Sequence, residues 1–274
     1  MKYAGLITII AATLAVASPA WADWDLGDPY KMHRPQLPDL QNGLNVLATW
    51  PKVIADDFRC TQTGPITGIH IWGSWLDDQF PTISGPAGGG IQDPGAVKFH
   101  LSIHRDIPAD PVNGEHSRPG ELLWQRDFEP DEFTHRLWAQ AREGFFDPNQ
   151  NEIIGFDTQV IQYNFTIPDT NAFPQEEGVI YWLDVTARPL DNNTRFGWKT
   201  SRDHWNDDSV FGDIPAVGGP PPTWTELFDP RTPPGTVPVS LDQAFVVTPE
   251  PATMSLLCVG GLALLRRKRR CDGR

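Results

Sequence analysis

The chain has 274 residues, a formal net charge of −13 and only three cysteines. Such an acidic chain repels phosphate groups, so its charge argues against a protein that binds nucleic acid. Between the two terminal segments Cys60 is the sole cysteine, which excludes an intrachain disulfide there as well as a zinc site built on cysteine pairs.

Residues 1–22 predict a secretory signal peptide. Lys2 precedes an apolar stretch, and small residues stand at Ala20 and Ala22. This is the order of charge, apolar core and A-x-A cleavage site that signal peptides share. The apolar stretch is short for a membrane-spanning helix. We therefore expect an N-terminal signal-peptide helix, cleavage after Ala22 and an exported chain that starts at Asp23.

Residues 23–248 form the body of the predicted exported protein. They contain 15 Lys and Arg against 33 Asp and Glu, so the net charge of the body is −18. The length suits one sandwich-sized β domain. A domain of this size buries enough surface to be held together by its core, without disulfides.

Several segments of the body predict strands. Residues 96–104 and 160–168 alternate between apolar and polar side chains, which is typical of half-buried strands. Residues 178–187 are apolar on both faces and predict a central strand. Further strands are expected at 52–58, 65–76, 121–128, 195–201 and 243–248. Short strands separated by turn residues predict an all-β fold, a single β-sandwich or jelly-roll-like domain.

Two segments leave the secondary structure open. Residues 132–146 are compatible with a helical turn or with a strand followed by a turn. Residues 216–238 are rich in proline but also contain Trp224, Leu227 and Phe228. Flexible linkers rarely carry large apolar residues so close together, so we expect an ordered loop here.

A first candidate site is the acidic stretch that begins at Asp147. Asp147, Asn149 and Asn151 match the alternating oxygen ligands of a calcium loop, and Asp157 follows near its end. The glycine and the closing glutamate of an EF-hand are absent, because Glu152 and Thr158 stand in their places. A looser structural calcium site and an ordinary Asx turn are the two interpretations.

A second candidate is the polar segment around Trp205. Trp205, Asp207 and Asp208 are residue types that contact sugars, and the segment is also compatible with a calcium site or with a hydrogen-bonded turn. Ten of the eleven tryptophans lie in the body. Packing in the core is the simplest role for them, and stacking on sugar rings is the alternative.

No catalytic motif is present, so we expect no enzymatic activity and no cofactor other than a structural calcium ion. Neighbouring residues of a strand point to opposite faces, so neither Asp56–Asp57 nor Asp77–Asp78 is a carboxylate pair for glycoside hydrolysis. His100 and His104 share a strand face about 13 Å apart, too far to hold one ion together. Two interpretations remain for the histidines: His70 faces His100 or His104 across a sheet, or the histidines are simply exposed on their strands.

The C-terminal segment combines three features. Pro249, Glu250 and Pro251 precede the 14 uncharged residues 252–265, which precede the basic residues Arg266, Arg267, Lys268, Arg269 and Arg270. A helix of 14 residues is about 21 Å long, shorter than the bilayer core of about 30 Å. The positive-inside rule keeps the basic residues cytoplasmic, so the body lies outside the inner membrane.

This segment, 249–270, resembles the PEP-CTERM sorting signal of Gram-negative bacteria. The resemblance implies recognition of Pro249, Glu250 and Pro251 by a membrane protease-transpeptidase, the exosortase. It also implies a transient tether in the inner membrane, removal of the tail, and transfer to the cell surface or extracellular matrix. A permanent membrane anchor is the alternative.

The body resembles an uncharacterised domain that is often found in such sorted proteins. The segments that carry this resemblance include residues 55–75 and 196–208. No activity is implied by it. The sequence therefore predicts a non-catalytic envelope or matrix protein. A carbohydrate-binding module that contacts a polysaccharide is one alternative, and a divergent secreted hydrolase is another.

Overall fold

The computed structural model describes residues 23–84, 89–215 and 221–249. Within these ranges the regular structure is almost entirely strand, with two short 3-10 turns, η1 (Leu76–Asp78) and η2 (Asp169–Asn171). No helix in the described part of the chain has the length and apolar character needed to cross a membrane. The predicted signal-peptide helix and the apolar tail helix lie outside the described residues.

The described strands form two large sheets and two small ribbons. Their bounds are β1 (Leu44–Leu47), β2 (Lys52–Arg59), β3 (Gly64–Ile66), β4 (Gly68–Trp75), β5 (Thr82–Ser84), β6 (Gly90–Gln92), β7 (Val97–Ile107), β8 (Arg118–Phe128), β9 (Phe133–Asp147), β10 (Glu152–Thr166), β11 (Phe173–Gln175), β12 (Ile180–Pro189), β13 (Phe196–Lys199), β14 (Val210–Asp213), β15 (Thr225–Glu226) and β16 (Phe245–Thr248).

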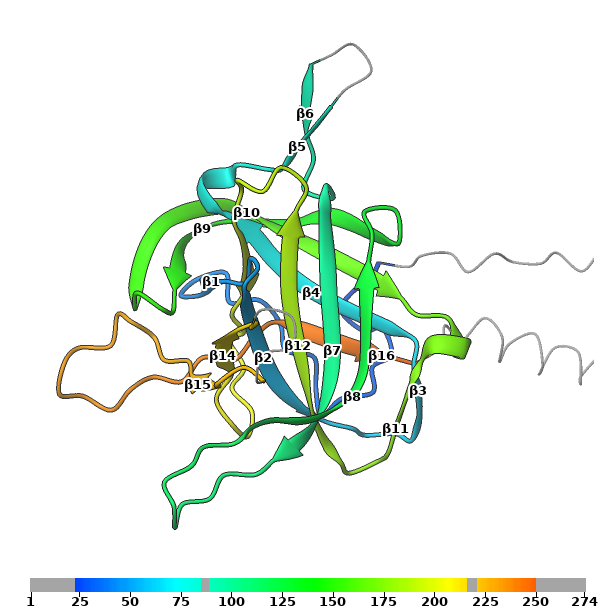
Figure 1. Cartoon of the computed structure of the whole chain (residues 1–274), viewed down its shortest axis with the longest axis vertical. Helices are drawn as coiled ribbons and strands as arrows, with labels where there is room; N and C mark the ends of the chain where they lie inside the picture. Colours follow the sequence, from blue (N-terminus) through cyan, green and yellow to red (C-terminus); the bar gives the residue numbers. More distant parts are fainter. Residues whose placement is uncertain (1–22, 85–88, 216–220, 250–274) are drawn as a thin grey trace, which may run out of the picture.

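One sheet, which we call the open sheet, has the order β15-β14-β2-β12-β7-β8. The other, the closed sheet, has the order β10-β9-β1-β13-β4-β16, and β10 also pairs with β4. This extra pairing joins β10, β9, β1, β13 and β4 into a ring of strands. Figure 1 shows β12 and β7 in front, with β4 crossing behind them and β9 and β10 arching over the top. The chain is therefore an all-β, sandwich-like domain, as predicted.

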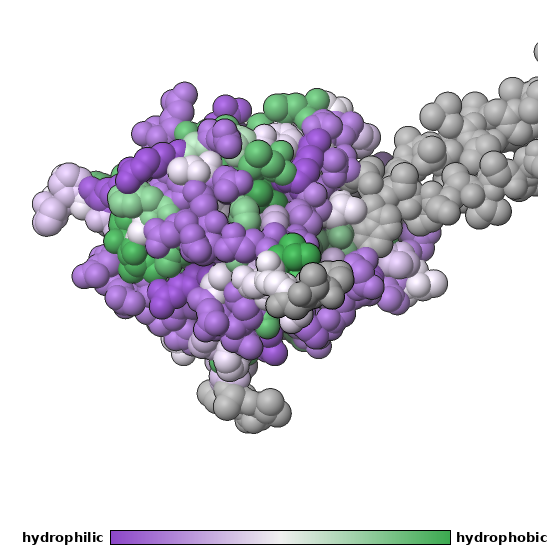
Figure 2. Space-filling view, turned by 90° about the horizontal axis from the view of Figure 1, so that it is seen from above, coloured by the Kyte–Doolittle hydropathy of each residue, from purple (hydrophilic) through white to green (hydrophobic). Residues whose placement is uncertain are grey.

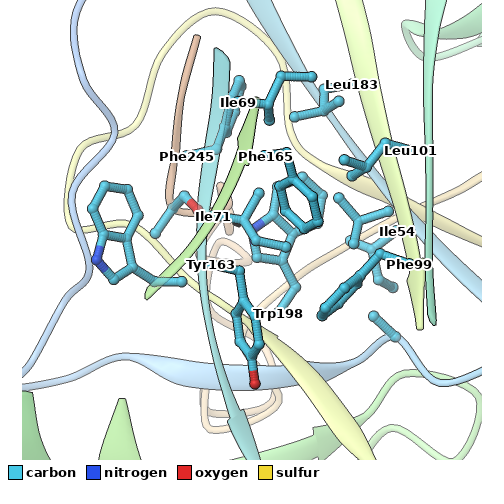
Figure 3. Packing of buried hydrophobic residues seen from close by; sticks show 14 of the residues in the cluster. Ile54, Ile69, Ile71, Phe99, Leu101, Tyr163, Phe165, Leu183, Trp198 and Phe245 are labelled. Carbon is cyan, nitrogen blue, oxygen red and sulfur yellow. Dashed lines mark hydrogen bonds between the residues drawn. The ribbon is translucent and has the colours of Figure 1, made fainter. Parts of the chain in front are cut away.

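The core lies between the two sheets. Phe99 of the open sheet meets the rings of Tyr163 and Phe196 of the closed sheet at centroid distances of 4.9 and 5.1 Å. Aliphatic side chains from both sheets fill the space around these rings, as Figure 3 shows for Ile71 and Leu101. Burial of this apolar surface stabilises a chain whose described cysteine, Cys60, is a free thiol.

The predicted alternation of residues 96–104 is confirmed in β7. Val97, Phe99, Leu101 and Ile103 are all completely buried. The predicted central strand, β12, lies between β2 and β7 and is buried along almost its whole length. The segment left open at 132–146 is a strand, because β9 pairs with β10 over most of its length and with β1 near its end.

Two further expectations are refined by the structure. The single strand expected at 65–76 is divided into β3 and β4, which belong to different sheets, with Thr67 between them. In the proline-rich segment, residues 216–220 lie outside the described residues. The rest is ordered as predicted: Leu227 is buried, and β15 adds an edge strand to the open sheet.

Candidate functional site

The loop that carries Trp205 is fastened to the body by hydrogen bonds. Asn206 has a positive φ of 60°, a conformation that asparagine tolerates better than most residues. Its amide nitrogen donates to Asp57 Oδ2 at 2.6 Å and to Asp207 Oδ2 at 2.7 Å. The Ser240 hydroxyl donates to Asp208 Oδ1. Both carboxylates predicted to contact sugar therefore already accept hydrogen bonds within the protein.

Trp205 is half-buried and stacks on His33, with ring centroids 4.0 Å apart. Its backbone N–H donates to Asp242 Oδ2 at 2.6 Å, and the His204 ring lies 2.7 Å from the other oxygen of Asp242. The structure thus brings Trp205, Asp207 and Asp208 together. These three residues belong to a turn that is held by hydrogen bonds, and His33 covers one face of the indole ring.

Asp56 and Asp57 point to opposite faces of β2, as strand geometry requires. Asp56 accepts hydrogen bonds from Gln36 Nε2 at 2.7 Å and from the Gln243 backbone N–H at 2.6 Å. Burial raises the pKa of Asp57 to about 9. It also raises the pKa of Asp56, with a further contribution from the charge of Asp242. Both are fully buried acids with hydrogen-bond partners inside the protein, and they do not face one another.

The residues of the calcium hypothesis are divided between two places. Asp147 ends β9, and its oxygens accept from the Asn149 backbone and from Gln150 Nε2 at 3.0 and 2.8 Å. Asn151 occupies the hairpin turn with a φ of 53°. Asp157 pairs in register with Glu143, about 13 Å along the strand from Asp147. In the described ranges no three His, Cys, Asp or Glu side chains are placed to hold a metal ion.

The histidines are also separated. His70 lies on β4 of the closed sheet, whereas His100 and His104 lie on β7 of the open sheet. His70 bonds to Asn164 at 2.7 Å, and His100 bonds to Asp127 at 2.8 Å. The conjecture that His70 faces His100 or His104 across a sheet is therefore wrong, because their strands do not pair.

A groove lies beside the open sheet, with a volume of about 720 Å³. It is lined by His104 on one side and by Trp224 on another, together with Ile107, 114–116, 118–121 and 221–223. Trp224 packs on a small outer cluster of Ala55, Trp182 and Val210. From the sequence, Trp224 is both an anchor of the proline-rich loop and one of the tryptophans at turns or strand ends that are candidates for stacking on sugar. Its proximity to residues 114–121 depends on the tertiary structure.

The His104 network at this groove resembles a catalytic triad in composition only. Ser102 Oγ and Asp184 Oδ2 both lie 2.9 Å from the same ring nitrogen, His104 Nε2. A triad needs the acid on one nitrogen and the nucleophile on the other, but here Nδ1 lies 3.1 Å from the Gly120 carbonyl. Burial acts to lower the pKa of His104, but Asp184 outweighs it and raises the pKa overall.

The face seen in Figure 2 is dominated by hydrophilic residues, with hydrophobic groups in small separate patches. Of the predicted sorting residues, Pro249 is the last described residue. Glu250, Pro251 and the basic cluster 266–270 lie outside the described residues, as do Ala20 and Ala22 at the predicted signal cleavage site.

Fold and sequence together define a two-sheet β protein that carries a C-terminal sorting segment. Residues 32–248 match the model of a family described as "Domain of unknown function (DUF7901)", and the chain belongs to that family. Residues 247–270 match the PEP-CTERM protein-sorting motif, which confirms the resemblance found in the tail. The motif implies an exported chain that is anchored in a membrane and then sorted, with processing by an exosortase. A search of curated proteins finds no match.

Proposed function

We propose that the body is a non-catalytic domain of the cell surface or extracellular matrix, delivered there by signal-peptide cleavage and exosortase processing. The burial of four acidic side chains, among them the Asp56–Asp57 pair, carries this proposal. Asp56, Asp57, Asp157 and Glu143 are each at most 4 % exposed, so none of them is available to a substrate from solution. A glycoside hydrolase, in contrast, needs a pair of carboxyl groups open to the bond that it cleaves.

Processing is tested by mass spectrometry of the mature protein from its native host. We expect residues 1–22 and the residues beyond the Pro249–Pro251 step to be missing from the mature chain. A mature protein that retains residues 252–270 would contradict exosortase processing and support the permanent anchor instead.

The absence of catalysis is tested by assaying the same mature protein against glycoside, peptide and ester substrates, with an Asp57→Asn variant in parallel. We expect no turnover above background in either sample. Turnover by the wild-type protein that the variant loses would assign Asp57 to a catalytic site and overturn the proposal.

Binding of a polysaccharide is the second candidate function, and the groove beside Trp224 is the observation that favours it. An aromatic ring, a histidine and the charged residues Glu115, Arg118 and Glu121 line the same open groove. Sugar-binding sites combine aromatic platforms with a few polar groups that fix the orientation of the ligand. The Trp205 loop is less suitable, since His33 covers one face of its indole.

The two tryptophan sites are separated by substitution. Retention of the mature protein on extracellular polysaccharide from the producing host should fall severalfold in Trp224→Ala. It should be unchanged in Trp50→Ala, since Trp50 is half-exposed and does not line the groove. A loss in Trp205→Ala alone would move the sugar site back to the acidic loop, and no retention of the wild type would remove this candidate.

A further inference from the structure

Four polar side chains meet inside the closed sheet, each from a different strand. Asn45 of β1 lies directly opposite Lys199 of β13, and Asp157 of β10 lies directly opposite Glu143 of β9. Because β1 also pairs with the end of β9, the two pairs lie side by side. Lys199 is 56 residues from Glu143 and 42 residues from Asp157 in sequence, so only the ring of strands brings the lysine to the two acids.

The contacts within this cluster are close and dry. Lys199 Nζ is in direct contact with Glu143 Oε2, and the two side chains are 0 % and 2 % exposed. Asn45 Nδ2 donates to Asp157 Oδ2 at 2.8 Å and reaches Glu143 Oε2 at 3.3 Å. Glu143 Oε1 has no hydrogen-bond partner within the described residues. The amine therefore lies beside a carboxyl group with one oxygen held and the other unengaged.

The surroundings exclude water from the amine. A Cβ atom on Gly43 would lie 2.5 Å from Lys199 Nζ, so the backbone at Gly43 closes directly over the amine. A Cβ atom on Gly197 would lie 2.9 Å from a ring carbon of Phe145. The Phe145 ring therefore packs directly against β13 two residues before Lys199. Phe145 itself is completely buried.

Burial also shifts the pKa values of the three ionisable groups in this cluster. It raises the pKa of Glu143, despite the attraction of Lys199. It raises the pKa of Asp157 to about 8, with a further contribution from Glu143, and it lowers the pKa of Lys199. The desolvation penalty of a buried ion pair is recovered only when both groups are fully hydrogen-bonded. Burial therefore disfavours the charged form of both groups, and the uncharged amine is the form that attacks a carboxyl carbon.

We propose that Lys199 and Glu143 become joined by a side-chain amide bond that forms within the folded chain. The Nζ lone pair attacks Cδ of the protonated Glu143 carboxyl to form an Nζ–Cδ bond. Oε2 remains as the amide oxygen, held by Asn45. Oε1 leaves as water after it receives a proton, and Asp157 carries this proton from Nζ to Oε1. The reaction is a condensation with no change of oxidation state, so it needs no co-reactant.

Such a bond would tie β13 to β9 across β1. It would supply a covalent cross-link to an exported chain whose described part contains one free cysteine and no disulfide. Loop closure by a covalent link lowers the entropy of the unfolded chain in the same way as a disulfide does, but an amide resists reduction. The inference does not depend on whether the body binds a polysaccharide or has a catalytic role.

The experiment is mass spectrometry of the full chain under denaturing conditions, followed by proteolysis and fragmentation. We expect a mass lower than that of the sequence by one water molecule, and a branched peptide that joins Lys199 to Glu143. The exposed pair Lys98–Glu129, at 2.8 Å, serves as an internal control and should appear in separate peptides. A chain with the full sequence mass, or a water loss that fragmentation places elsewhere, would overturn the proposal.

Substitutions keep the test independent of folding, because mass is read on the unfolded chain. Lys199→Met and Glu143→Ala should each have the full mass of their own sequences. Glu143→Gln should still cross-link, with loss of ammonia in place of water. Asp157→Asn should react much more slowly than the wild type. An equal rate in that variant would overturn the assignment of proton transfer to Asp157.

Discussion

His70 Nδ1 lies 2.7 Å from the side-chain oxygen of Asn164, and this bond connects the two ends of the body. The Asn164 amide nitrogen donates to Asp23 at 2.9 Å, so the Asn164 oxygen is the acceptor and His70 Nδ1 carries the proton. His70 Nε2 is then left to accept from the hydroxyl of Thr248 at 3.4 Å. Asp23 and Thr248, near the two ends of the described body, therefore lie beside the same pair of strands.

Asn164→Ala tests this connection. The substitution leaves the buried His70 N–H without its acceptor and releases Asp23. A buried donor that loses its partner costs about 1–3 kcal/mol. We expect a decrease of that size in the free energy of unfolding, measured by urea denaturation, and faster proteolysis near residue 23. Asn193→Ala, at an exposed turn, should change the stability by less than about 0.5 kcal/mol. Equal effects of the two substitutions would contradict the role of Asn164.

His70 should make the stability depend on pH. Burial lowers its pKa from the ordinary 6.5 to about 4, so the unfolded chain binds a proton between these values when the folded chain does not. The contribution of His70 to stability is therefore lost as the pH falls from 6.5 towards 4, by about 1.4 kcal/mol per pH unit. Denaturation curves of the wild type and His70→Gln should diverge in this window and run parallel above pH 7. Parallel curves throughout would show that His70 titrates normally.

Asp57 should make the stability depend on pH in the opposite direction to His70, with stability lost as the pH rises. Burial raises its pKa from 3.8 to about 9, so the folded chain holds a proton that the unfolded chain releases. This contribution is present below pH 3.8 and is lost as the pH rises towards 9. Asp57→Asn keeps an oxygen that can accept from Asn206 but does not ionise. Its free energy of unfolding should exceed that of the wild type more at pH 8 than at pH 5, and a smaller gain at pH 8 would contradict the assignment.

Phe99 should be among the most sensitive positions of the core. Its ring contacts Phe133, Tyr163, Phe165 and Phe196, all from the opposite sheet. Phe99→Ala removes these contacts and leaves a cavity, which costs about 3–5 kcal/mol. Phe156→Ala is the matched control, since Phe156 is 44 % exposed, and thermal melting should show little change for it. A similar loss of stability in both variants would place the core elsewhere.

Local pattern was enough to predict most of the strands. The alternation at Val97, Phe99 and Leu101 predicted which face of β7 is buried, because a strand places alternate residues on one side. The apolar residues on both faces of β12 predicted a strand with neighbours on both sides. Segment 132–146 resisted prediction, because Trp138 and its neighbours became a strand only by pairing with β10, which no local preference encodes.

The sequence by itself determined the sorting motif, the all-β class and the absence of intrachain disulfides in the body, since these depend on composition, order and short-range periodicity. Tertiary structure alone decided how distant side chains are combined. It separated Asp157 from Asp147, placed Trp224 beside His104, and seated Lys199 against Glu143. The physical reason is that strand order and the closure of β10 onto β4 depend on packing across the whole domain, while signals and periodicity are carried by residues close together in the chain.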